Sequence, residues 1–297
     1  MTSTPTRSDI TTADGIIAGP LRSSVNSSRE ARGSIHDDAT ATKLGFRGGT
    51  VAGSIHMELF PPLLLKAFGQ RWFEHGTLSM YFTNATTDRE PVRAFLREPA
   101  AGATDAQVDA WVEREDGMRV AEGSASVGDP GEPTALQRRP LDRFETGELR
   151  MLAGIGPGFE FEPVEVRLDP QQQKNRLNVI TERLDWYDGD SPWGGPIATP
   201  AAMVQLLYAK SMETLRGRLG PAVGLFGAIE LRNIKGPVFV DQPYRVTGKV
   251  LAVGQSPKTE YMWFETGMDE PNGDRVAEMR MLLRWMKASS PRYAEPS

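Results

Sequence analysis

The chain has 297 residues, of which 39% are hydrophobic, 30 are glycine and 22 are proline. This composition is typical of a folded protein with many turns and a large core. The formal net charge of -5 argues against broad nucleic-acid binding, which requires a basic surface. The absence of cysteine excludes disulfides, thiolate metal sites and a cysteine nucleophile. No apolar run reaches transmembrane length, and no secretory signal is recognisable, so we expect a soluble cytoplasmic protein without membrane contacts.

The chain contains an internal repeat. A group of residues in the segment 48–57 recurs after a shift of 146: Gly48, Gly49, Val51, Ala52 and Met57 match Gly194, Gly195, Ile197, Ala198 and Met203. A second group in the segment 117–122 recurs after a shift of 156 in the segment 273–278. The sequence therefore predicts two copies of one unit, at residues 14–128 and 159–288, joined by a linker at 129–158.

Each copy has the same order of expected elements. A helix follows the Gly-Gly pair: in the second copy Thr199 is a good N-cap, Pro200 a good first residue, and the helix continues to about Gly217. In the first copy Pro61-Pro62 must kink or restart the helix. Strands rich in β-branched and aromatic residues follow, at 77–85, 92–97, 108–113 and 119–127 and again at 224–233, 244–253, 259–265 and 275–285.

This order predicts an α+β fold, in which a curved antiparallel sheet wraps each long helix. We expect the two sheets to join edge to edge, because pairing hides strand edges that would otherwise be exposed. A short helix near 141–152 is expected to bridge the halves.

The segment Ile35–Met57 concentrates residues with chemical potential. All three histidines, His36, His56 and His75, lie in the first copy, and the position that matches His36 in the second copy is Glu182. A histidine on a loop can exchange a proton while a carboxylate orients its ring. We therefore expect His36 to be the catalytic residue, with Asp38 or Asp37 as its partner.

Both aspartates also fit a structural role, because either can cap a short helix near Ala39–Leu44. The first amides of the helix near Gly53 and Ser54 are suited to hold a carbonyl oxygen that gains negative charge. Substrate contacts are accordingly expected at five residues: Gly49, Gly53, Ser54, His56 and Trp193. Packing is the alternative for His56 and Trp193, and a simple turn is the alternative for the glycine pair.

Several residues of this segment form a pattern that is similar to a known family. The run Ile35-His36-Asp37-Asp38, followed by Gly45-Phe46, Gly48-Gly49 and Val51-Ala52-Gly53, resembles the MaoC-like (R-specific enoyl-CoA hydratase type) proteins. The duplicated layout resembles their double hot-dog members. The resemblance implies a helix wrapped by a curved sheet and reversible hydration of enoyl thioesters of coenzyme A.

One position departs from the family pattern. The family's motif has an aspartate five residues before the histidine, where this chain has Ala31. The neighbouring Glu30 would face the other side of a strand. Either Asp37 or Asp38 replaces the missing group, or the reaction differs, or catalysis is lost.

We therefore expect a hydratase or dehydratase that acts on an enoyl or 3-hydroxyacyl thioester, or on a similar conjugated carbonyl compound. The alternatives are a lyase, isomerase or thioesterase-like enzyme on another substrate, and a non-catalytic acyl-binding protein. No metal is expected, since no His/Asp/Glu cluster has ligand spacing. No cofactor is expected either, with coenzyme A entering only as part of the substrate. The expected partner is a small molecule, and the protein is expected to be a monomer or a homodimer.

Overall fold

The computed structural model describes residues 9–141, 147–208 and 212–294. In this part of the chain twelve strands form one antiparallel sheet. The strands are β1 (Thr11–Ala13), β2 (Ile16–Ala18), β3 (Arg22–Ser23), β4 (Gly76–Phe82), β5 (Pro91–Arg97), β6 (Ala106–Arg114), β7 (Arg119–Val127), β8 (Glu160–Arg167), β9 (Gly224–Asn233), β10 (Pro243–Gln255), β11 (Thr259–Asp269) and β12 (Arg275–Met286). Their order across the sheet is β1-β2-β5-β6-β7-β4-β9-β12-β11-β10-β8, and β3 pairs with β5.

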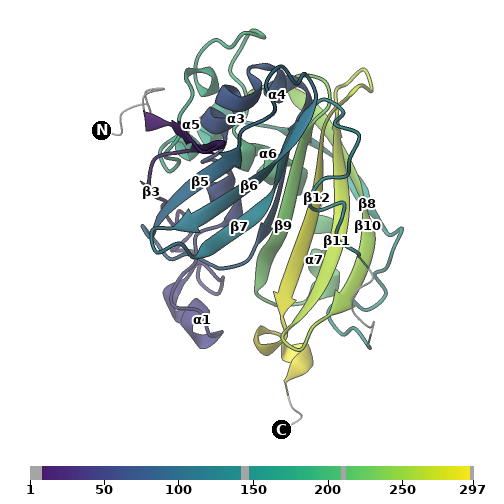
Figure 1. Ribbon diagram of the computed structural model, residues 1–297. Helices are drawn as coiled ribbons and strands as arrows, with labels where there is room; N and C mark the ends of the chain where they lie inside the picture. The colour runs from purple at the N-terminus through teal and green to yellow at the C-terminus, as the bar shows by residue number, and fades with distance from the viewer. Residues whose placement is uncertain (1–8, 142–146, 209–211, 295–297) are drawn as a thin grey trace.

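The helices gather mainly on one side of this sheet (Figure 1). They are α1 (Asp38–Lys43), α2 (Gly53–Met57), α3 (Pro61–Phe68), α4 (Arg71–His75), α5 (Pro170–Leu177), α6 (Pro200–Tyr208) and α7 (Glu213–Leu219). Three short 3-10 helices also occur in the described residues, η2 (Asp185–Tyr187), η3 (Lys287–Ser289) and η4 (Pro291–Tyr293). In this part of the chain, no helix is long and apolar enough to cross a membrane.

The two halves of the sheet mirror the sequence repeat. The strands β4 to β7 and their counterparts β9 to β12 follow the same neighbour order outward from the centre of the sheet. The halves join where β4 pairs with β9, from Thr77 opposite Arg232 to Tyr81 opposite Ala228. This pairing confirms the predicted edge-to-edge junction, and it removes one exposed edge from each half.

The first central helix is broken where the proline pair predicts. Helix α2 ends at Met57, and α3 begins at Pro61, with proline in its first turn. Proline is favourable in a first turn, where its missing N–H has no helical partner to lose. The break lies inside the core, because Met57, Phe60 and Leu64 are all fully buried.

The second central helix begins as the sequence predicts. Thr199 Oγ1 accepts a hydrogen bond from the amide of Ala202 at 3.3 Å, and Pro200 is the first helical residue. Residues 209–211 of the expected helix lie outside the described residues, and helix α7 follows from Glu213. The helix expected near 141–152 is wrong for its described part, because residues 147–152 have no helical structure.

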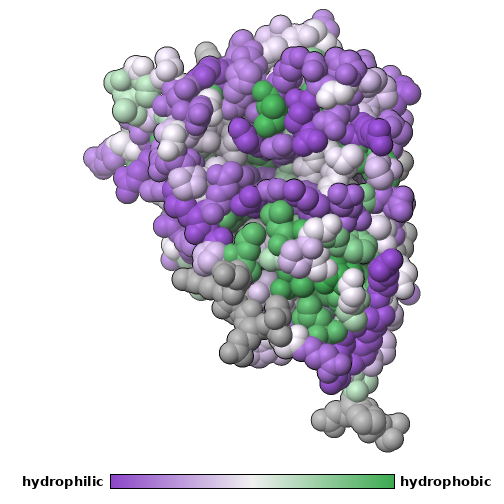
Figure 2. Space-filling model, turned by 90° about the vertical axis from the view of Figure 1, so that its right-hand side faces the viewer, coloured by the Kyte–Doolittle hydropathy of each residue, from purple (hydrophilic) through white to green (hydrophobic). Residues whose placement is uncertain are grey.

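The free edge of the second half is strand β8, which the sequence pattern did not predict. It lies last in the sheet order, beyond β10. Phe161 and Val166 are buried, whereas Glu160, Glu162 and Glu165 are exposed. Charges and the internal Pro163 protect such an edge from pairing with other chains. Figure 2 looks onto this side of the molecule, where hydrophilic side chains dominate the upper half and hydrophobic ones gather lower down.

Candidate active site

A cavity of about 160 Å³ lies between the two units, beside the start of α2. Its wall contains His36 and Gly53 from the Ile35–Met57 segment of the first copy, and Phe82 and Thr86 from the end of β4 and the following loop. The second copy contributes Leu225 and Phe226 from the start of β9. The site is therefore built from both halves, although only the first half supplies imidazole groups.

The ring of His36 is oriented by a backbone carbonyl. Its Nδ1 lies 2.7 Å from the carbonyl oxygen of Thr50. A carbonyl oxygen can only accept, so Nδ1 carries the proton and donates it. In the neutral ring the other nitrogen, Nε2, is then an acceptor. No partner for Nε2 occurs among the described residues, and His36 is half-buried on the cavity wall.

The backbone of His36 is held as firmly as its ring. The side-chain amide of Asn26, itself buried, donates to the His36 carbonyl oxygen at 2.8 Å. The amide of Thr50 donates to the carbonyl of Ile35 at 3.0 Å. A Cβ atom at Gly49 would collide with the carbonyl oxygen of His36. The glycine at position 49 thus allows the two segments to approach closely enough for the ring to reach Thr50.

Neither aspartate orients His36 in this structure. Asp37 is the N-cap of α1: its carboxylate accepts from Thr40 Oγ1 at 2.6 Å and from the amide of Ala39 at 3.3 Å. The hydrogen bond from Thr40 lowers the pKa of Asp37 below its ordinary value, helped by the amide of Gly33. Asp38 Oδ1 accepts from the amide of Gly49 at 2.6 Å. The capping alternative is confirmed for Asp37, and the amide of Gly49 is engaged by Asp38 and does not face the cavity.

The start of α2 forms one wall of the cavity. Gly53 is its first residue, and the cap residue Ala52 makes no side-chain hydrogen bond. The first amides of a helix lack partners within the helix, so this end offers donors to a ligand oxygen. The ring of Phe82 packs directly on Gly53, where an added Cβ would lie 2.6 Å from the ring. Ser54 is buried and does not line the cavity.

His56 lines the cavity but differs from His36 in its burial. Its Nε2 lies 2.8 Å from Thr86 Oγ1, and its exposed fraction is 3%. Burial lowers the pKa of His56 from 6.5 to about 4. The ring is therefore neutral at physiological pH and serves to shape the wall and anchor Thr86.

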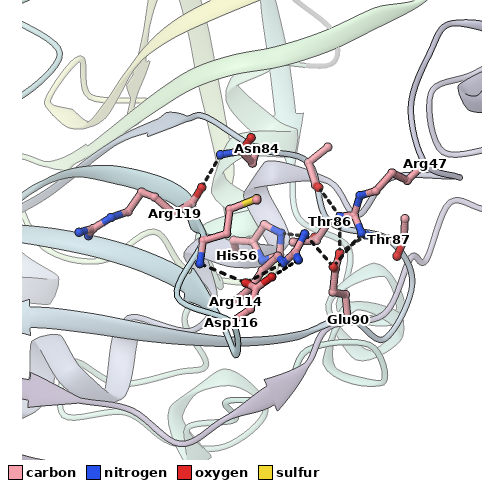
Figure 3. A network of polar contacts seen from close by, with 11 residues as sticks. Arg47, His56, Asn84, Thr86, Thr87, Glu90, Arg114, Asp116 and Arg119 are labelled. Atoms are coloured by element: carbon pink, nitrogen blue, oxygen red, sulfur yellow. Dashed lines mark hydrogen bonds and ion pairs between the residues drawn. The ribbon is translucent and has the colours of Figure 1, made fainter.

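The loop between β4 and β5, which carries Thr86, is fixed by a charge network (Figure 3). Glu90 lies between the guanidinium groups of Arg47, at 2.8 Å, and Arg114, at 3.2 Å. Arg47 also donates to the carbonyl of Ala85 at 3.2 Å. Burial alone would raise the pKa of Glu90. The hydrogen bonds from Arg47 and the amide of Thr87, together with the positive charges of Arg47 and Arg114, outweigh burial, and the net shift is downward. The Arg47 guanidinium thus binds Glu90 and the Ala85 carbonyl and holds this loop in place.

The expected contact at Trp193 lies elsewhere. Trp193 packs against Phe73 and Trp186, with ring centroids 5.8 and 5.5 Å apart, and its Nε1 donates to Glu74 at 2.7 Å. Trp193 thus packs against neighbouring rings and lies off the wall of this cavity. Glu182, the counterpart of His36, is buried in an ion pair with Arg22. Burial raises the pKa of Glu182 even though Arg22 opposes the shift.

The structure thus brings His36, Gly53 and His56 to one cavity and leaves Asp37, Asp38, Gly49, Ser54 and Trp193 off its wall. Sequence reasoning missed the Thr50 carbonyl, because a backbone acceptor has no residue signature. It also missed Leu225 and Phe226, which reach the cavity only because β4 and β9 pair. Within the described residues, no group of His, Asp or Glu side chains has a metal-binding arrangement.

Comparison with solved structures supports the fold. A MaoC domain protein of Chloroflexus aurantiacus superimposes with a TM-score of 0.60 over 96% of this chain and 98% of its own, at 11% identity. A conserved hypothetical double hot-dog protein of Mycobacterium tuberculosis gives a TM-score of 0.61 over 95% and 99%, at 11% identity. A MaoC-like dehydratase gives 0.53 over 90% and 97%, at 12% identity.

The chain therefore has the double hot-dog fold, as the resemblance in Ile35–Met57 and the repeat predicted. No family model matches the sequence, and no curated protein matches it.

Proposed function

We propose that the protein is a hydratase or dehydratase that adds water reversibly to a conjugated carbonyl compound, with enoyl thioesters of coenzyme A as the first substrates to consider. The observation that carries this proposal is the state of His36. The Thr50 carbonyl holds Nδ1 at 2.7 Å, so Nε2 keeps its lone pair, and His36 lines a cavity whose wall is mostly apolar. That is the arrangement which general base catalysis requires.

One imidazole can carry both proton transfers of such a reaction. Nε2 of His36 would accept a proton from water as the water oxygen bonds to the β-carbon of the substrate. The electrons of the double bond move to the carbonyl oxygen, and the resulting enolate would be held by the free amides at Gly53. The imidazolium then returns its proton to the α-carbon, and the neutral ring is restored. This sequence needs no carboxylate, which fits the presence of Ala31 where the family has an aspartate.

A second candidate is an isomerase that moves a double bond along a conjugated carbonyl compound. It is favoured by the engagement of both nearby carboxylates, Asp37 and Asp38, in the backbone around α1. A lone base can carry one proton between two carbon atoms without binding a water. If the protein is instead a non-catalytic acyl-binding protein, its affinity for the ligand should not fall when His36 is replaced.

The test is turnover of a panel of enoyl thioesters by the wild type and by His36→Asn, with His75→Asn as the matched control. His75 also has Nδ1 against a backbone carbonyl, that of Ile234 at 2.9 Å, but it is remote from the cavity. We expect hydration to fall about a hundredfold to ten-thousandfold in His36→Asn and to be unchanged in His75→Asn. Double-bond migration without hydration would favour the isomerase. No turnover of any thioester by folded wild type would overturn both enzyme proposals.

A further inference from the structure

The proposed function leaves the size of the acyl group open, and the cavity wall limits it. Resting on that function, we infer that this site takes short acyl groups, of about four to six carbons, and rejects long acyl chains. The inference depends on the volume of the cavity and on the packing of the side chains that enclose it.

The volume sets the upper limit. An apolar cavity of about 150 Å³ accepts benzene, a guest of about six carbon atoms. The cavity beside His36 has about 160 Å³. It must also admit the carbonyl group of the substrate near Gly53, which uses part of this space. A butenoyl or hexenoyl group therefore fits, whereas a decenoyl group exceeds the available space.

The aromatic walls cannot easily withdraw. Phe82 lies directly against Gly53, without a gap on that side. Phe226 packs edge-to-face on Tyr208, with ring centroids 5.2 Å apart and an interplanar angle of 76°. Each ring is thus supported by a residue of a central helix, α2 or α6. A longer chain would have to displace one of these packed rings, which costs contacts that the chain does not replace.

The remaining apolar wall is supported by a small hydrophobic cluster. Leu225 and Phe46 pack against buried Ile35, together with Val223 and Met286. Ile35 immediately precedes His36, so displacement of this cluster would also disturb the ring that performs the chemistry. Discrimination by chain length and orientation of His36 therefore depend on the same packed side chains.

The experiment measures binding and turnover separately, along one series of chain lengths. Saturated butyryl-, hexanoyl-, octanoyl- and decanoyl-CoA are titrated into the wild type by calorimetry, and the matching 2-enoyl-CoA thioesters are assayed for hydration. We expect butyryl- or hexanoyl-CoA to bind at least about tenfold more tightly than decanoyl-CoA, since methylene groups that do not fit would have to displace a packed wall side chain. Phe226→Ala and Leu225→Ala enlarge the cavity, and each should shift the preference towards octanoyl- and decanoyl-CoA by about tenfold or more.

Phe95→Ala is the matched control. Phe95 stacks on Trp111, with ring centroids 5.3 Å apart, and it does not line the cavity. It should leave the chain-length preference unchanged. The variants at Phe226 and Leu225 remove different side chains, so a folding failure in one leaves the other to report. Short-chain preference in binding without hydration would support the inference and overturn the proposed function. Affinity that is equal for all lengths, that rises with length, or that is absent for every member would overturn the inference.

Discussion

Position 49 provides the sharpest test of how the site is assembled, because the sequence repeat contains its control. Gly49 and Gly195 are equivalent in the two copies. A Cβ at position 49 would collide with the His36 carbonyl oxygen and lie 3.0 Å from its carbonyl carbon. At position 195 a Cβ would meet nothing within 4 Å. We therefore expect Gly49→Ala to damage the site and Gly195→Ala to be tolerated.

The magnitude follows from what the new methyl group meets. The obstacle at position 49 is backbone, which cannot rotate away as a side chain does, so relief requires the 35–38 and 48–50 segments to separate. Overpacking of this kind costs about 1–3 kcal/mol of unfolding free energy. A shift of about 1 Å in a catalytic group can lower a rate about a hundredfold. Both losses are expected together, because the hydrogen bond between His36 and Thr50 spans these segments.

The assay is urea unfolding of both glycine variants, followed by turnover of the best enoyl thioester. Gly195→Ala should retain the midpoint and the rate of the wild type. Gly49→Ala should unfold at a lower urea concentration and lose most of its rate even where it is fully folded. Equal stability and equal rate in the two variants would refute the argument that position 49 sets the place of His36.

Three further predictions concern the charged and buried groups near the site. Asp37→Ala should lower the midpoint of urea unfolding, because α1 loses its N-cap. In parallel rate assays the pH profile of turnover should stay unchanged, and a displaced profile would return Asp37 to the catalytic role. Glu58 is buried and accepts from the amide of Ala201 at 2.6 Å, and burial raises its pKa from 4.5 to about 7. The folded state therefore binds the Glu58 proton more tightly than the unfolded state does, so protonated Glu58 stabilises the fold below pH 4.5, and this stabilisation is lost as the pH rises through 7. Glu58→Gln should remove up to about 3 kcal/mol of this loss of unfolding free energy. An unchanged pH dependence of unfolding in the variant would contradict this prediction. For His56 the pKa is lowered from 6.5 to about 4. Its contribution to the unfolding free energy is therefore present above pH 6.5 and falls by up to about 3 kcal/mol towards pH 4. His56→Gln should reduce this loss of stability at acid pH in the same unfolding series, and an equally steep loss would show that other groups cause it.

Much of the fold was predictable because its signals are local. Strands β7 and β9 have the bounds that alternation and β-branched residues predicted, and Pro61 marks the restart of the central helix. The repeat predicted two units and their joined sheets. Strand β8 was missed because its glutamates and Pro163, which suit an edge, weaken the signal of a strand.

The site was less predictable because its decisive contacts are not local in the sequence. Histidine and aspartate side by side suggest a pair, yet the carboxylates of Asp37 and Asp38 satisfy amides of α1 and Gly49. The carbonyl that orients His36 belongs to Thr50, and any residue could supply it. The walls at Leu225 and Phe226 come from the other copy, so their position depends on the register of β4 against β9.

The state of the His36 ring is the central claim, and nitrogen NMR tests it most directly. The chain has only three histidines, so selective ¹⁵N-histidine labelling gives a small set of signals that His36→Asn and His75→Asn assign. At mildly alkaline pH we expect the His36 ring to carry its proton on Nδ1, with an unprotonated Nε2 whose signal moves when butyryl-CoA is added. A proton on Nε2, or a signal that no acyl thioester disturbs, would contradict the assignment of His36 as the base of this site.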